Sequence, residues 1–127
     1  MGKITQAHRD LIKEVGLCYT ASAAPDGTPN VSPKGSITVV DDDHIAFAEI
    51  MSPHTRENLQ ENPRVAVMVC KPETFEGFQF KGTAALTSDG AVFDMLVQAI
   101  ADKGLKLPPV QNAVTIRVED VRRIGEN

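Results

Sequence analysis

One short segment gathers side chains that suit a phosphate group. Residues 52–56 read Ser-Pro-His-Thr-Arg, and Ser52 followed by Pro53 is a typical start of a helix. A helix N-terminus exposes free N–H groups and a partial positive charge. The hydroxyl, imidazole and guanidinium groups at this point would add donors for the oxygens of a phosphate monoester. The same residues are also typical of an ordinary capped helix with a solvated first turn. From this segment alone, that is the simpler interpretation.

Two further segments have residue types that could line a ligand. In residues 29–36 (PNVSPKGS), two prolines and a glycine interrupt a strand-like sequence. Such an irregular strand can aim backbone N–H groups at the polar edge of a ring, although a bulge or a plain edge strand gives the same pattern. In residues 78–82 (FQFKG), alternation places Phe78 and Phe80 on one face. Gln79 would then face either a ligand or water.

No side chain stands out as a catalytic acid, base or nucleophile. The sequence has no glycine-rich nucleotide loop, no GxSxG and no HExxH. His8 and His44 are expected to be solvated. Cys18 and Cys70 lie far apart in apolar runs, outside any Cys-x-x-Cys or Cys/His cluster, and are expected to be buried, reduced thiols. We therefore expect no metal site, and we expect any chemistry to be carried by a cofactor.

Composition narrows the class of protein. The chain has 127 residues, 42% of them hydrophobic and 24% charged, which predicts a single globular domain over residues 1–127. The net charge of −4 argues against nucleic acid as a partner, because binding phosphates needs a dense basic face. No apolar run approaches the ~18 residues of a membrane span. The start has no apolar signal region, so we expect a cytoplasmic protein without a membrane partner.

Turn signals divide the chain into three short helices and six or seven short strands. The expected helices cover about 6–15, 53–62 and 91–103, and the expected strands 17–23, 30–32, 36–40, 44–49, 64–70, 78–86 and 114–124. Strands and helices do not alternate, and tight turns join neighbouring strands. This pattern predicts a mainly β protein whose antiparallel sheet closes into a barrel.

The segments follow one another in the order of a known family. An Asp-Gly turn precedes a proline-rich strand ending in Ser-Pro-Lys-Gly (32–35), and a hairpin with an acidic turn follows (41–43). The pattern Ser-x-x-Thr-x-x-Asn-Leu-x-x-Asn-Pro then runs from 52 to 63, and Lys-Gly-Thr-Ala stands at 81–84. Over residues 5–122 this set resembles the FMN-binding split-barrel family, the pyridoxamine 5′-phosphate oxidase-like proteins. Its small single-domain members are the most similar.

The resemblance implies a fold, an assembly and a cofactor. The family fold is a six-stranded antiparallel split β-barrel with short helices, which forms homodimers with FMN at the subunit interface. By position, residues 32–34 would lie along the isoalloxazine edge and 48–51 beside the ring and ribityl chain. His54 and Thr55 would hold the phosphate. The implied cofactor-binding residues are Ser32, Pro33, Lys34, Ala48, Glu49, Ile50, Met51, Ser52, His54, Thr55, Arg56 and Gln79.

The sequence also departs from the oxidases that name the family. Those enzymes carry an arginine near Ser32, an Arg-Lys pair at 54–55 and an Arg-Gln pair at 76–77, where this chain has His-Thr and Glu-Gly. Their C-terminal arginine region has no counterpart before Asn127. Pyridoxamine 5′-phosphate oxidation is therefore not expected.

The expected function is that of an FMN-binding oxidoreductase or electron carrier with a small-molecule or protein redox partner. Two alternatives remain open. The same fold could bind the deazaflavin F420 or haem, or the protein could be a ligand-free dimeric adaptor. Lys34 near a flavin would favour its negatively charged reduced form, and Glu49 would oppose this if it faced the same space.

Overall fold

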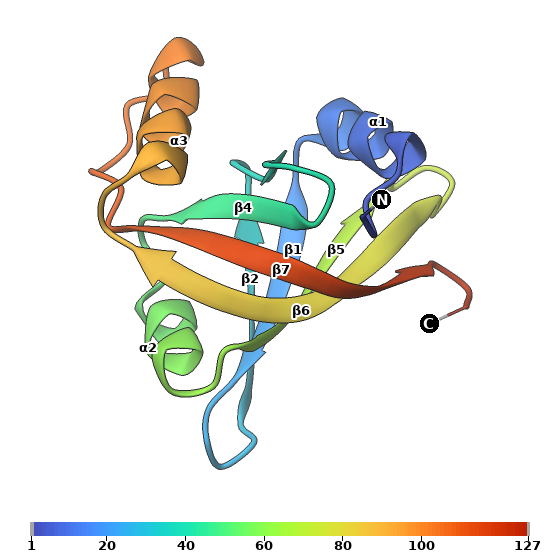
Figure 1. The fold of residues 1–127 in the computed structure, drawn as a ribbon, viewed down its shortest axis with the longest axis horizontal. Helices are drawn as coiled ribbons and strands as arrows, with labels where there is room; N and C mark the ends of the chain where they lie inside the picture. Colours follow the sequence, from blue (N-terminus) through green and yellow to red (C-terminus); the bar gives the residue numbers. More distant parts are fainter. Residues whose placement is uncertain (1, 127) are drawn as a thin grey trace.

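Seven strands form one antiparallel sheet that curls into an open half-barrel (Figure 1). The computed structural model describes residues 2–126. The order of strands in the sheet is β2-β1-β5-β6-β7-β4-β3. The strands are β1 (Cys18–Ala23), β2 (Pro29–Lys34), β3 (Thr38–Val39), β4 (His44–Glu49), β5 (Arg64–Cys70), β6 (Gly77–Thr87) and β7 (Asn112–Arg123).

This arrangement confirms the mainly β, antiparallel class but corrects the number of strands. The resemblance implied six strands, and the sheet has seven. The additional edge strand is β3, which has two residues and pairs only with β4, through Thr38 with Ala46 and Val39 with Ile45.

Alternating side chains fill the concave side of the sheet. In β5, Val65, Val67 and Val69 are buried while the residues between them are partly exposed. They pack with Phe80 of β6 and with residues of β4 and β7 in one hydrophobic cluster. A period of two with β-branched residues is what a sheet with one covered face requires.

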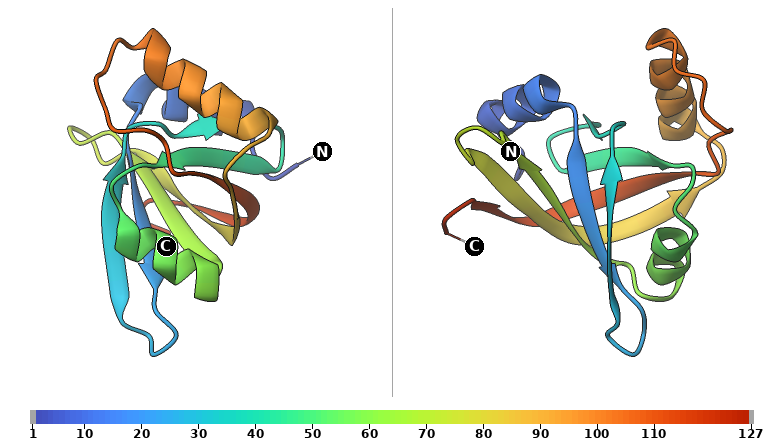
Figure 2. Two further views of the ribbon diagram at one scale, coloured as in Figure 1. Left: turned by 90° about the vertical axis from the view of Figure 1, so that its left-hand side faces the viewer. Right: turned by 180° about the vertical axis from the view of Figure 1, so that it is seen from behind.

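Three helices cover different parts of the sheet. They are α1 (Gln6–Val15), α2 (Pro53–Glu61) and α3 (Ala91–Asp102). Both views of Figure 2 show α1 and α2 at different ends of the curled sheet, with α3 standing apart beside β4. The contacts of α3 with β4 and β7 form a second, smaller cluster, whose buried members are Ala46, Ala48, Leu96 and Ala113.

Helix α1 is bounded by the caps that the sequence indicates. Thr5 and His8 form a capping box, in which His8 N–H donates to the Thr5 hydroxyl and Thr5 N–H donates to His8 Nδ1. Gly16 ends the helix in the left-handed conformation. The expectation that His8 is solvated is wrong. His8 lies on the same helix face as Leu11 and Ile12, and its ring meets the edge of Phe78 at a centroid distance of 4.4 Å.

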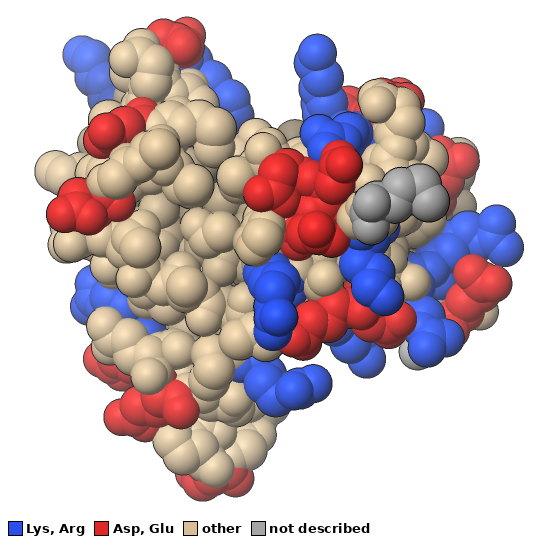
Figure 3. Space-filling model, in the orientation of Figure 1, with Lys and Arg blue, Asp and Glu red and all other residues tan. Residues whose placement is uncertain are grey.

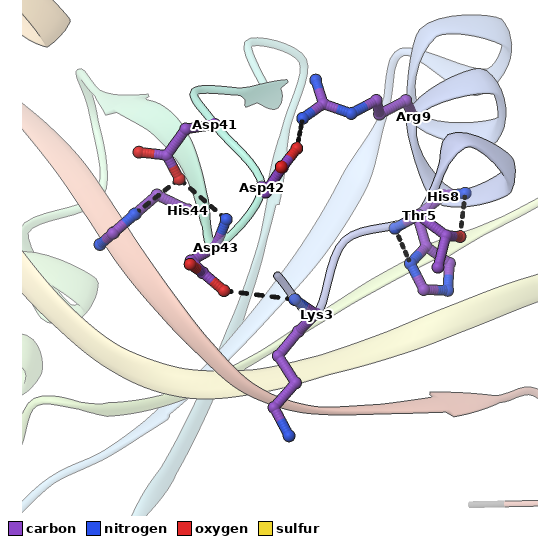
Figure 4. A network of polar contacts seen from close by, with 8 residues as sticks. All are labelled: Lys3, Thr5, His8, Arg9, Asp41, Asp42, Asp43 and His44. Carbon is purple, nitrogen blue, oxygen red and sulfur yellow. Dashed lines mark hydrogen bonds and ion pairs between the residues drawn. The ribbon is translucent and has the colours of Figure 1, made fainter. Parts of the chain in front are cut away.

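The acidic turn before β4 ties the N-terminal segment to the sheet (Figure 4). Asp42 accepts from the Arg9 guanidinium at 2.6 Å, and Asp43 accepts from the backbone N–H of Lys3 at 3.2 Å. Asp41 contacts the His44 ring at 2.8 Å. The turn therefore supplies acceptors to its own hairpin and to the start of α1.

The buried His8 ring should make stability depend on pH. Burial lowers the pKa of His8 below its ordinary value of 6.5, so below about pH 6.5 the unfolded chain binds a proton that the folded chain resists. The free energy of unfolding should then fall as pH drops through this range. His8→Gln keeps an acceptor for Thr5 N–H but cannot titrate. Urea titrations at pH 7.5 and pH 5 give the free energy of unfolding at each pH, and its change between the two should be smaller in the variant than in the native protein. An equal change in both proteins would contradict the role of His8.

Charged side chains are unevenly spread over the surface. In the view of Figure 3, acidic and basic groups intermingle closely over the part of the molecule that carries α1 and the chain ends, while on the side of α3 they are scattered around a larger uncharged surface. The described residues of α3 include the exposed apolar side chains Met95 and Val97.

Candidate ligand-binding site

A cavity of about 360 Å³ lies between the ends of β2 and β4 on one side and the C-terminal end of α3 on the other. Its apolar wall comes from Ile50, Met51, Ile100, Leu105 and Leu107. The remaining lining residues are Ser32, Pro33, Lys34, Gly35, Ser36, Ala48, Ser52 and Lys103. A concave and mainly apolar space with a few polar groups is the usual form of a small-molecule site.

A second hollow is larger, about 560 Å³, and lies beside α1 and the C-terminal strand. Its charged lining residues include Asp120, which pairs with Arg122, and Arg123, which pairs with Glu126. Because these charged groups are already paired with one another at the surface, this hollow has fewer groups available to bind a ligand than the cavity beside α3.

Seven of the twelve residues singled out from the sequence line the cavity beside α3. They are Ser32, Pro33, Lys34, Ala48, Ile50, Met51 and Ser52. The structure thus brings together two segments that are separated in the sequence, the end of β2 and the end of β4 with its following turn. Lys103 joins α3 to the first of these segments, because its ammonium group donates to the Gly35 carbonyl oxygen at 3.1 Å.

Lys34 places a positive charge in the cavity wall. Its side chain is buried, its ammonium group donates to Ser52 Oγ, and its nitrogen lies 5.5 Å from the centre of the Phe47 ring. Burial lowers the pKa of Lys34, while the nearby Glu49 and Cys18 partly oppose this shift. Cys18 itself is a buried free thiol whose pKa burial raises to about 11, so it is not a reactive thiolate.

Glu49 does not line the cavity, although it follows Ala48, which does. Successive residues of a strand point to opposite faces, so Glu49 shares the inner face with Ile45 and Phe47. It is fully buried. Its Oε2 accepts from Ser52 N–H at 3.1 Å, and its Oε1 lies 3.5 Å from the Arg56 guanidinium. Lys34 therefore belongs to the cavity lining and Glu49 does not, although both charged groups contact Ser52.

The start of α2 lacks the side-chain cap that the sequence suggests. Ser52 is the N-cap residue, but its hydroxyl makes no capping hydrogen bond. The hydroxyl instead accepts from Lys34 and lies 3.5 Å from Glu49 Oε2. The first-turn N–H groups of α2 are therefore left without a capping side chain, directly beside the cavity to which Ser52 belongs.

The other predicted residues of this helix do not line the cavity. Thr55 is fully buried, and its hydroxyl accepts from Asn30 Nδ2 at 3.0 Å and pairs with Ser32 Oγ at 3.1 Å. The His54 side chain is 81% exposed, with Nδ1 3.9 Å from Glu57 Oε2. Arg56 is turned toward Glu49. All three residues lie in the first turn of α2. Thr55 connects this turn to the cavity through its contact with Ser32.

Gln79 lies away from the cavity. It is on β6, which the sheet order separates from β2 by β1 and β5. Its register partner is Met68, which in turn pairs with Tyr19. These three residues form a row on one face of the sheet, and Tyr19 is 45% exposed. The sequence did not single out the wall from the end of α3 and the segment after it, namely Ile100, Lys103, Leu105 and Leu107. Asn30, which binds Thr55, lies in the candidate segment 29–36 but was not among the predicted cofactor-binding residues.

No group of three or more His, Cys, Asp or Glu side chains in residues 2–126 could hold a metal ion. Within the same residues, no helix is long and apolar enough to cross a membrane.

A family model described as pyridoxamine 5′-phosphate oxidase matches residues 4–125. Among solved structures, HupZ of Group A Streptococcus is 26% identical, with a TM-score of 0.85 over 95% of this chain and 94% of that one. An FMN-binding protein of Syntrophomonas wolfei is 17% identical, with a TM-score of 0.80 over 92% of this chain and 83% of that one. The sequence has no significant match among the curated proteins.

Neighbours with other ligands in their names share the fold as well. An F420 reductase is 19% identical, with a TM-score of 0.73 over 94% of this chain and 98% of that one. HutZ, the haem storage protein of Vibrio cholerae, is 16% identical, with a TM-score of 0.66 over 97% and 95%. At these identities the likeness shows the fold alone.

Proposed function

The chain belongs to the pyridoxamine 5′-phosphate oxidase-like family of split-barrel proteins, and we propose that it is a homodimeric flavoprotein that binds FMN non-covalently. It would act as an oxidoreductase or electron carrier for a small-molecule or protein redox partner. The observation that carries this proposal is the buried Lys34 in the lining of an otherwise largely apolar cavity, next to the uncapped start of α2.

The residues present fit the chemical character of FMN. The planar ring of FMN has apolar faces that suit the wall of Ile50, Ile100 and Leu107. Its polar edge suits Ser32 and Lys34, and its phosphate suits the free N–H groups at the start of α2. His54, Thr55 and Arg56 surround that point, which supports their assignment to the phosphate. Gln79, on the outer face of the sheet, would belong to the ring site only through the partner in a dimer.

The chemistry would come from the cofactor, and the protein would control its surroundings. Bound FMN supplies the transfer of a hydride or of single electrons. Lys34 holds a positive charge at the cavity wall, and Leu105 and Leu107 contribute apolar surface to it. The Ser36 hydroxyl accepts from Ala48 N–H at 2.8 Å and so joins the two cavity-lining segments. Oxidation of pyridoxamine 5′-phosphate is not part of the proposal, because the oxidases' arginines are absent at the matching positions.

The outer face of β1, β2 and β5 supports the dimer. Val31 is 67% exposed, and it pairs across the sheet with the exposed Ala21. The next row along the strands contains Tyr19 and Met68. An apolar strip of this kind is typical of a surface that another chain covers, and we propose a second copy. The free thiols Cys18 and Cys70 support a reducing compartment such as the cytoplasm.

Val31→Glu should weaken this dimer. A carboxylate on the apolar strip would become a buried and unpaired charge when the second copy covers the strip, which is unfavourable. Light scattering should give twice the chain mass of 13.7 kDa for the native protein and a lower mass for the variant at low micromolar concentration. Val97→Glu, on the exposed surface of α3, is the matched control and should stay dimeric. A native mass of one chain would exclude the dimer.

The ligand is tested by the colour of the purified protein. We expect the visible spectrum of a flavin and, after denaturation, FMN at close to one per chain by mass spectrometry. A single strong violet band would indicate F420 instead, and a Soret band would indicate haem. A colourless protein that fails to bind added FMN would overturn the flavoprotein proposal and favour a ligand-free adaptor.

A further inference from the structure

We propose that Glu49 is an internal anion that occupies the phosphate donors of this site and thereby sets how tightly a phosphate-bearing flavin is held. This inference rests on the proposed function and names the residue that tunes its ligand affinity. In this view the bound flavin can exchange with flavin in solution.

The contacts around the start of α2 carry the first step. Ser52 N–H and the Arg56 guanidinium are donors that could reach a phosphate, and both already point at the carboxylate of Glu49. The Ser52 hydroxyl lies against the same carboxylate. A carboxylate accepts the same hydrogen bonds as a phosphate, so the protein supplies its own competitor.

Burial makes this competition costly for the ligand. Glu49 is fully buried, whereas the Arg56 side chain is 34% exposed. Arg56 can therefore turn toward a ligand at the surface, but Glu49 cannot follow it or turn to water. A phosphate that draws Arg56 away leaves a buried carboxylate with one partner fewer, which is unfavourable.

The local charge balance points the same way. Lys34 and Arg56 bring two positive charges, while Glu49 and Glu57 bring two negative charges to the same end of α2. The residue types at 52–56 suggest a cluster of positive charge that would attract a phosphate. The side chains around the start of α2 have no net charge and attract it less. The structure thus offers geometry for a phosphate without an excess of positive charge.

The test is Glu49→Gln, which keeps an acceptor for Ser52 N–H and removes the charge. Titrations followed by flavin fluorescence should show about tenfold tighter binding of FMN, equivalent to about 1.4 kcal/mol. Riboflavin, which lacks the phosphate, should bind with nearly unchanged affinity. In an Arg56→Met background the gain for FMN should shrink, because the released donor is missing. Glu57→Gln, at an exposed carboxylate near the same turn, should give a smaller gain.

Several outcomes would overturn the role of Glu49. These are unchanged or weaker FMN binding in Glu49→Gln, an equal gain for riboflavin, or a full gain in the Arg56→Met background. Thermal unfolding of each variant checks that the fold is kept, and the increase in melting temperature on adding inorganic phosphate gives a readout independent of flavin. If no flavin binds any variant, the proposed function fails. The inference about Glu49 then stands only if phosphate stabilises Glu49→Gln more than the native protein, and fails otherwise.

Discussion

Gly82→Ala is expected to destabilise the fold by at least about 3 kcal/mol, at or beyond the upper end of the usual cost of overpacking. Gly82 lies in β6 where the register with β7 shifts after Lys81. A Cβ at this position would lie 2.0 Å from the Arg117 carbonyl oxygen and 3.0 Å from Ile116 Cγ2. The first of these atoms is backbone within the β6–β7 pair, so it cannot move aside without breaking the longest pairing of the sheet.

Urea unfolding followed by circular dichroism measures this effect. Gly35→Ala is the matched control, because an added Cβ there meets no atom within 4 Å and the backbone is not left-handed. The control should change the free energy of unfolding by less than about 1 kcal/mol, as is usual for surface substitutions. Equal and small effects at both positions would show that β6 and β7 can separate at the bulge at little cost.

Local signals explain how much of the fold could be predicted. The strands His44–Glu49 and Arg64–Cys70 are observed with the predicted bounds, because a short apolar run is bounded in each case by turn residues, a helix start or proline. Strand β2 instead continues through Pro33 to Lys34. It is an edge strand with β1 as its only neighbour, and an edge tolerates the missing N–H of proline. Whether a strand lies at an edge depends on the sheet order, which local sequence does not contain.

The candidate site was predictable only where it is local in sequence. Residues 32–34 and 48–52 carry their own signals and do line the cavity, with the exception of Glu49. The alternation of side chains along a strand could have predicted that Ala48 and Glu49 point to opposite faces of the sheet, so that only one of them lines the cavity. The wall from Ile100, Leu105 and Leu107 could not be foreseen, because apolar residues on a helix face or in the segment that follows it do not show which other element they approach. The same holds for Gln79, whose distance from the cavity follows from the strand order.

Lys34→Met is expected to make the reduction potential of bound FMN more negative by roughly 30–60 mV, which corresponds to about 1.4–2.8 kcal/mol for two electrons. Reduction of a flavin can add negative charge to the ring, and Lys34 is the buried cation in the cavity wall. A charge a few ångströms away in a medium of effective dielectric about 20 contributes a few kcal/mol. Methionine has a similar length and keeps the wall filled, so the variant removes the charge with little change of shape.

Lys103→Met provides the matched control, since Lys103 lines the same cavity but is exposed to solvent. Water screens its charge, so its removal should move the potential by much less than that of Lys34. Potentials are measured by equilibration with reference dyes, after thermal unfolding has shown that both variants fold. A loss of FMN binding in Lys34→Met alone would show that the same charge is already required to hold the cofactor. Equal shifts in the two variants would mean that net charge, and not the buried position of Lys34, sets the potential. Glu49 would then be the first residue to replace together with Lys34, because the two opposite charges lie close together and both contact Ser52.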